Sequence, residues 1–273
     1  MSSVFDFELK HEPQSTKAVL LFHGMTGSPF ELTKYAKNLH KQGFDVYGYC
    51  LPGHGDHPQN IYTVAWEDWI NFSNQKYNNL RGQYDEFFLG GLCLGAVISL
   101  NLAQQHNDVT GIISLSTTLF LDGWTIPWFN FLFPLGLHTI LRYYYTFPER
   151  EPYGIKNEIV RRKIANLMTR NTVAMDNYPM SCIYELLELS KNTRANIKKV
   201  TAPILLIHSQ EDDLTSIKSA KFVYKNISSE NKELVTLNNS YHLVLYDNEK
   251  ELVFRKSAEF LNSLSKQKQE VSA

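Results

Sequence analysis

Residues 85–96 read DEFFLGGLCLGA, and this stretch decides how the rest of the sequence is interpreted. The run DEFFL predicts a buried strand, and the residues from Ala96 onward follow a helical pattern. Between them, Cys93 has a glycine two positions away on either side, Gly91 and Gly95. A tight strand-to-helix turn needs such small neighbours when it projects a side chain from the sheet. The stretch therefore predicts a nucleophile whose thiolate is favoured by the helix N-terminus.

The pentapeptide GLCLG at residues 91–95 also fits a second interpretation. Cysteine is commonly a small buried hydrophobic residue, and a glycine-rich turn can serve packing alone. Short glycine-spaced matches occur often by chance, so this stretch by itself favours neither interpretation. Other parts of the chain have to decide between them.

Several short apolar runs, separated by turn signals and helical patterns, surround this turn. Strands that are buried on both faces are continuously apolar, so this rhythm is typical of a mostly parallel sheet with helices on both faces. The sequence thus predicts an α/β fold with a doubly wound sheet. The expected strands are 18–22, 43–49, 85–89, 111–115, 204–207 and 232–237, and the expected helices are 30–42, 66–80, 96–105 and 250–264.

Two later loops supply an acid and a histidine. Asp212 and Asp213 follow the expected strand 204–207, and His242 follows the last expected strand. The carboxyl ends of parallel strands meet at one edge of a sheet, so nucleophile, acid and histidine in this chain order fit the α/β-hydrolase arrangement. Taken singly, an acidic turn or a loop histidine is more often an ordinary surface feature. The order and spacing together carry the hypothesis.

The stretch from 117 to 199 has no convincing strand, and its helical candidates are 157–169 and 181–190. Such a long interval inside a compact domain is normally functional. We expect an inserted helical cap over the carboxyl edge of the sheet. The chain then divides into a first part of the hydrolase core at 1–116, the cap at 117–199 and a second part of the core at 200–273.

Composition and charge exclude several classes of protein. The 273 residues include 27 Lys plus Arg and 28 Asp plus Glu, so the net charge of −1 provides no positive field for binding nucleic acid. Three cysteines are too few for a disulfide framework, and the first 13 residues contain no apolar signal run, which favours a cytoplasmic protein. The apolar stretch 119–141 is interrupted by Asp122, Gly123 and two prolines, so no transmembrane segment is expected.

Together with the turn at 91–95, five further segments resemble the single-domain carboxylesterase and monoacylglycerol-lipase branch of the α/β-hydrolase superfamily. The resemblance spans most of the chain and is weakest in 117–199. It implies hydrolysis of a small-molecule ester without a cofactor. The five segments are LLFHGMTGSPFEL at 20–32, LPGHG at 51–55, WEDW at 66–69, API at 202–204 with the acidic loop after it, and SYHLV at 240–244.

The resemblance also assigns roles in a Cys-Asp-His triad. It aligns Ser209 with the family's usual glycine and places the acid three positions later, which selects Asp212, with Asp213 as the fallback. His242 would take the proton of Cys93, and Asp212 would fix the histidine tautomer.

An oxyanion hole is expected beside the nucleophile. Its two donors would be the backbone N–H groups of Met25 and Leu94. The resemblance implies that His23, the histidine of the family's His-Gly pair, supports the oxyanion turn and does not act as a base.

One departure from the family stands out, because members usually have serine where this chain has Cys93. The Gly-Leu-Cys-Leu-Gly turn resembles the cysteine elbow of dienelactone hydrolases. We therefore expect cleavage of esters or thioesters of apolar acyl groups through an acyl-Cys93 intermediate. A dienelactone-type or acyl-transferring thiol enzyme, a serine-to-cysteine variant, and a ligand-binding module that has lost turnover stay open as alternatives.

Aromatic residues are frequent in the expected cap. We name Trp124, Trp128 and Phe129 as candidates for an apolar substrate pocket, although at least half of the cap aromatics are expected to form the cap's own core. A weak peripheral membrane contact by residues 124–133 stays open, but no basic flank supports it. No pairing of His, Cys and carboxylate residues has metal-ligand spacing, and no glycine loop fits a phosphate, so neither a metal nor a cofactor is expected.

Overall fold

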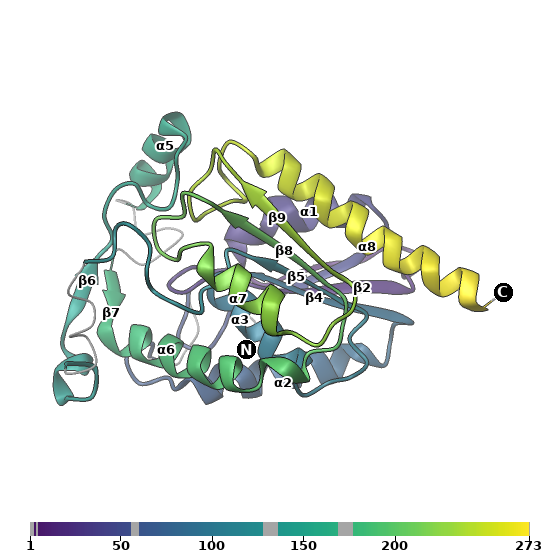
Figure 1. Cartoon of the computed structure of the whole chain (residues 1–273), viewed down its shortest axis with the longest axis horizontal. Helices are drawn as coiled ribbons and strands as arrows, with labels where there is room; N and C mark the ends of the chain where they lie inside the picture. The colour runs from purple at the N-terminus through teal and green to yellow at the C-terminus, as the bar shows by residue number, and fades with distance from the viewer. Residues whose placement is uncertain (1–2, 4, 56–59, 128–135, 169–176, 273) are drawn as a thin grey trace.

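Figure 1 shows the computed structural model, which describes residues 3, 5–55, 60–127, 136–168 and 177–272. Its main feature is a seven-stranded sheet in the order β1-β3-β2-β4-β5-β8-β9. Only β1 runs antiparallel to its neighbour, β3. The strands are β1 (Phe7–Leu9), β2 (Lys17–Phe22), β3 (Asp45–Gly48), β4 (Glu86–Leu92), β5 (Gly111–Leu115), β8 (Ile204–Ser209) and β9 (Lys232–Leu237).

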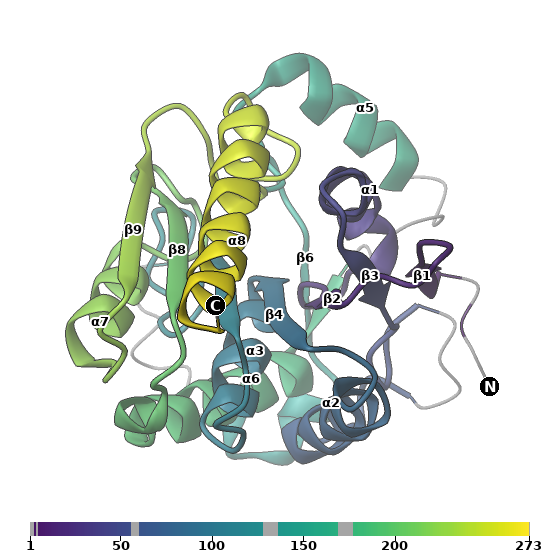
Figure 2. The same cartoon turned by 90° about the vertical axis from the view of Figure 1, so that its right-hand side faces the viewer.

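Helices cover both faces of this sheet (Figures 1 and 2). On one face, α1 (Thr33–Lys41) and α8 (Lys250–Ser272) pack over a buried cluster that includes Leu39 and Leu261. On the other face, α2 (Trp66–Arg81), α3 (Leu94–Ala103), α6 (Met180–Ala195) and α7 (Lys218–Asn226) enclose a second cluster. The predicted α/β fold, with a mostly parallel and doubly wound sheet, is therefore confirmed.

The central strands form because their residues are apolar along their whole length. Every residue of β4 and β5 is buried, as expected for strands covered on both faces. All six expected strands are present, with small shifts at their ends. β1 was not predicted, because its three residues are too few to show a pattern and one of them is exposed.

Residues 117–199 lie between β5 and β8. They contain the short 3-10 helix η3 (Ile140–Tyr143), β6 (Thr146–Pro148), α5 (Glu158–Met168), β7 (Asn177–Pro179) and α6. The predicted helices match α5 and α6. The antiparallel pair β6–β7 has no counterpart in the sequence-based prediction, because each strand has only three residues.

Figure 1 shows β6, β7 and α5 beyond the carboxyl ends of the parallel strands, whereas α6 lies beside α2 and α3. The segment therefore reaches from the side of the sheet to the edge where the strands end. None of the helices within the described residues is long and apolar enough to cross a membrane.

Candidate active site

Cys93 occupies the junction between β4 and α3 in a strained conformation. Its φ of 57° and ψ of −113° lie in a region that L-residues rarely adopt. The turn needs glycine at both flanking positions, because a side chain there would overlap backbone atoms. A Cβ on Gly91 would lie 2.3 Å from the carbonyl carbon of Gly95, and a Cβ on Gly95 would lie 2.0 Å from the carbonyl oxygen of Phe22. The Cys93 N–H donates to the Leu115 carbonyl at 3.0 Å, which ties the turn to β5.

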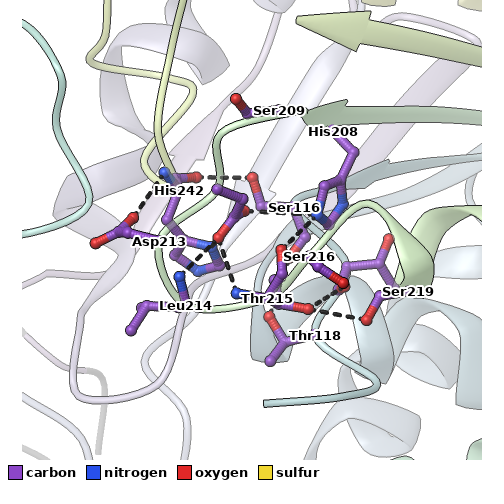
Figure 3. Close-up of polar contacts among 12 residues, drawn as sticks. Ser116, Thr118, His208, Ser209, Asp213, Leu214, Thr215, Ser216, Ser219 and His242 are labelled. Atoms are coloured by element: carbon purple, nitrogen blue, oxygen red, sulfur yellow. Dashed lines mark hydrogen bonds and ion pairs between the residues drawn. The ribbon is translucent and has the colours of Figure 1, made fainter. Parts of the chain in front are cut away.

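The loops after β8 and β9 bring a carboxylate to an imidazole. Nδ1 of His242 lies 2.8 Å and 3.0 Å from the two carboxylate oxygens of Asp212. The backbone N–H groups of Leu214 and Thr215 each donate to Asp212 Oδ1 at 2.9 Å (Figure 3). Asp212 is therefore a fixed acceptor, and it holds His242 in the tautomer that carries its proton on Nδ1.

Asp213, the fallback acid, makes a different contact. Its Oδ1 accepts a hydrogen bond from the backbone N–H of His242 at 3.2 Å, whereas the ring is bonded to Asp212 (Figure 3). Ser116 acts on the same segment from the other side, since its hydroxyl donates to the His242 carbonyl at 2.7 Å. The two groups fix the histidine backbone.

Cys93 and His242 alter each other's acidity. Burial opposes the charged form of the imidazole, but the Asp212 carboxylate and the Cys93 sulfur together raise the pKa of His242 well above its usual value. Burial likewise opposes the thiolate, but His242, the Thr118 hydroxyl and the Met25 backbone lower the pKa of Cys93. Within the described residues, Nε2 of His242 has no partner of regular hydrogen-bond geometry. Contacts of this kind commonly tighten only when substrate is bound.

Of the two residues expected to form the oxyanion hole, Met25 lies in the turn after β2 and Leu94 directly follows Cys93. The Met25 backbone hydrogen-bonds the Cys93 sulfur, and Leu94 opens α3, where the first N–H groups have no helical partner. Both predicted residues are therefore close to the sulfur: Met25 contacts it in space, and Leu94 follows Cys93 in the chain. The Gly24 N–H donates to the Glu31 carboxyl at 2.5 Å, which anchors the turn from behind.

His23 lies beneath this turn with both ring nitrogens in use. Nδ1 donates to the Gly24 carbonyl at 2.8 Å, and Nε2 accepts from the Leu51 N–H at 3.0 Å. Burial, together with the nearby His54, lowers the pKa of His23 to about 3. A neutral imidazole with two backbone partners braces the turn.

Several groups near the site had no signal in the sequence. The Thr118 hydroxyl lies 3.3 Å from the Cys93 sulfur, and His208 donates to the Thr215 carbonyl at 2.9 Å beneath the Asp212 loop. Tyr178, in β7, is near enough for the Cys93 sulfur to contribute to the raised pKa of its phenol. Isolated Thr, His and Tyr residues are common, so only the fold could show that these lie together.

The three predicted pocket aromatics have different outcomes. Trp124 is 58% exposed, its indole N–H donates to the Glu211 carbonyl at 3.1 Å, and its ring packs on Tyr241. It therefore lies above the loops that carry the acid and the histidine. Trp128 and Phe129 lie outside the described residues.

Three features together define an α/β-hydrolase. They are a mostly parallel sheet, a strained strand-to-helix turn that carries Cys93, and a His–Asp pair on later loops. The chain matches the Hydrolase_4 family, described as serine aminopeptidase S33, over residues 13–250, and it belongs to this family. It is thus a lipase- and esterase-like α/β-hydrolase.

Known relatives agree with this assignment. The chain is 27% identical over 253 residues to a thermostable monoacylglycerol lipase of Bacillus sp. (strain H-257), with 89% of each chain covered. It is 24% identical over 249 residues to a carboxylesterase of Bacillus subtilis (strain 168), covering 91% of this chain and 93% of the relative.

Solved structures share the fold. A structure reported for LipS and LipT, two metagenome-derived lipolytic enzymes, is similar with a TM-score of 0.80 at 24% identity, covering 96% of this chain and 100% of that one. A soluble variant of monoglyceride lipase from Saccharomyces cerevisiae also has a TM-score of 0.80, at 17% identity, covering 95% and 91%.

Proposed function

We propose that the chain hydrolyses esters or thioesters of apolar carboxylic acids through an acyl intermediate on Cys93. The observation that carries this proposal is the strained Cys93, whose sulfur and the His242 imidazole shift each other's pKa while Asp212 holds the far side of the ring at 2.8 Å. Two relatives are named as a monoacylglycerol lipase and a carboxylesterase, which favours an ester substrate over an amide.

The reaction follows from the roles of these groups. His242 takes the proton of Cys93, and the sulfur attacks the acyl carbon while Met25 and Leu94 N–H groups stabilise the oxyanion. His242 then gives the proton to the leaving alcohol or thiol, which departs and leaves a thioester on Cys93. Water, deprotonated by His242, attacks that thioester, and the acid leaves as the thiol re-forms. Losing one oxyanion donor costs about 3 kcal/mol of transition-state stabilisation in comparable sites.

We further propose that residues 117–199 act as a cap that lines the acyl site. Trp124 and Tyr178 support this, because one packs against the Asp212–His242 loops and the other lies near Cys93. The aromatic character of this segment suits an apolar acyl group.

The test is turnover of a panel of p-nitrophenyl esters, and of the matching acyl thioesters, by the wild type, Cys93→Ala and Cys93→Ser. We expect measurable activity in the wild type and its loss in Cys93→Ala. If Cys93→Ser is also inactive, a thiol enzyme is established. If it is much more active, the site is built for serine.

Intact-mass spectrometry gives an independent readout. With a slowly deacylated substrate we expect a mass increase equal to one acyl group, located on Cys93 and released by hydroxylamine. Absence of both turnover and adduct in the wild type, together with tight binding of an intact apolar ligand, would replace the proposal with a ligand-binding module.

A further inference from the structure

Two histidines and a buried aspartate gather at the end of the sheet opposite the active site. Asp45 begins β3, His40 lies in the last turn of α1, and His11 follows β1. One ligand atom from each of the three residues lies within 4.8 Å of the other two. Figure 2 shows α1, β3 and β1 side by side at one edge of the sheet.

This cluster is separate from the catalytic centre. Asp45 pairs with Ala18 at the start of β2, whereas the oxyanion turn follows the other end of β2, after Phe22. Whatever binds among these three residues therefore does not touch Cys93 or His242.

The imidazole of His40 is prepared as a ligand. Its Nδ1 faces the Phe44 carbonyl at 3.2 Å and must donate to it, which leaves the lone pair of Nε2 available. Metal-binding histidines almost always donate their other ring nitrogen in this way.

The carboxylate of Asp45 is prepared as well. It is fully buried, and its Oδ2 accepts from the Tyr84 hydroxyl at 3.0 Å. Its Oδ1 lies 2.9 Å from His11 Nδ1 and also accepts the His11 backbone N–H at 2.9 Å. Hydrogen bonds that orient a ligating carboxylate are typical of metal sites.

The spacing fits a small tetrahedral cation. Zn²⁺ with bonds of about 2.0–2.1 Å separates neighbouring ligand atoms by about 3.3 Å, close to the 2.9 Å between His11 and Asp45. The His11 and His40 rings are direct neighbours, with their centroids 3.9 Å apart.

From this arrangement we infer that His11, His40 and Asp45 bind a divalent cation of the zinc type. The cation replaces the proton between His11 and Asp45, and water completes its tetrahedron. It joins the β1–β2 loop, the end of α1 and the start of β3, so its effect is on stability and not on turnover. The sequence predicts no metal site here, because the three ligands come from separate segments that form no linear motif.

The experiment is zinc titration of the full chain by calorimetry after treatment with a chelator. All proteins carry Cys93→Ala, because the thiol beside His242 would itself bind zinc. We expect one Zn²⁺ per chain and a melting temperature about 3 °C or more higher with zinc in excess. Adding His40→Ala removes a ligand at a partly exposed helix end and should weaken binding about 100-fold or more.

A matched control is His138→Ala, which removes an exposed histidine elsewhere and should leave zinc binding unchanged. Tyr84→Phe should weaken binding about tenfold, since it keeps all three ligands and removes the hydroxyl that orients Asp45 and also bonds Tyr47. If His40→Ala does not fold, as judged by circular dichroism, His11→Gln gives the same test. Zinc binding that is absent, or that survives both ligand substitutions, would overturn the inference.

Discussion

Cys93 differs from Cys182 in its electrostatic surroundings. His242 and two hydrogen bonds lower the pKa of Cys93, whereas burial raises the pKa of the Cys182 thiol well above its usual value. The thiolate is the reactive form, so one of these sulfurs is activated and the other is inert. Access differs less, since Cys93 is 8% exposed and Cys182 is fully buried.

We therefore predict that iodoacetamide alkylates Cys93 faster than Cys50 or Cys182 in the folded protein, as measured by peptide mass spectrometry. The rate should rise with pH through the lowered pKa of Cys93 and should persist below the pH at which an ordinary thiol reacts. His242→Ala makes Cys93 slightly more accessible, but it also removes the positively charged imidazolium that stabilises the thiolate. The substitution should therefore slow the reaction. Equal labelling of the three cysteines would contradict an activated thiol.

Glu31 is a carboxyl group in an environment that disfavours its charge. Burial raises the pKa of Glu31 to about 7, although the Gly24 N–H and the neighbouring His242 favour the carboxylate. The folded protein then holds this proton more tightly than the unfolded chain does. Unfolding releases the proton between about pH 4.5 and pH 7, so Glu31 makes the folded state less stable as the pH rises through that range.

Glu31→Gln keeps an oxygen acceptor for Gly24 and removes the titration. We expect the substitution to raise the melting temperature at about pH 8 relative to the wild type, and to have little effect at about pH 5. Glu67→Gln, on the exposed face of α2, is the control and should show no such dependence. A difference between Glu31→Gln and the wild type that does not change with pH would refute the raised pKa.

At the scale of elements, the turn between β4 and α3 requires the backbone at Gly95, in the first turn of α3, to lie against the backbone at Phe22, the last residue of β2. A methyl group on Gly95 would overlap the Phe22 carbonyl of β2, and backbone atoms cannot move aside as a flexible side chain would. We predict that Gly95→Ala lowers the free energy of unfolding by about 2 kcal/mol or more, measured by urea titration. Gly82→Ala is the matched control, because nothing lies within 4 Å of its added methyl group. Equal effects of the two substitutions would show that close packing at the turn is not required.

Long apolar runs are the part of the fold that the sequence predicts well. β4 and β5 follow from nearly continuous apolar residues, and the amphipathic spacing of α1 and α2 gives both helices nearly to their ends. β8 runs two residues further than predicted, because His208 and Ser209 are polar but still pair with β9. α7 has only nine residues and was not predicted.

The catalytic candidates were predictable because chain order and loop position restrict them strongly. Cys93, Asp212 and His242 each follow a recognisable strand, so the topology alone brings them to one edge. Thr118 and Tyr178 could not be found in this way. Each reaches the site from a segment whose course depends on tertiary packing, and its residue type carries no signal in the sequence.

At the scale of the whole molecule, one carboxylate links the 117–199 segment to the loop of His242. Asp247 is buried, and its Oδ2 accepts the N–H groups of Lys156 and Tyr241, each at 2.7 Å. Its Oδ1 accepts the Asn157 N–H at 2.9 Å. Next to this junction, the Leu243 N–H donates to the Gly154 carbonyl at 2.7 Å. The two segments are thus fixed to each other directly beside the imidazole.

Asp247→Asn tests whether this link holds the site together. The amide would place an NH₂ group against backbone N–H donors that now meet a carboxylate, so we expect a loss of about 2 kcal/mol or more in stability. We also expect slower ester turnover and slower alkylation of Cys93, because His242 is no longer held in place. Glu251→Gln, an exposed change in the first turn of α8, should alter neither property. If Asp247→Asn lowers the melting temperature but leaves alkylation of Cys93 at its original rate, the junction stabilises the fold without positioning the imidazole, and Asp212, Asp213 and Ser116 hold His242 without it.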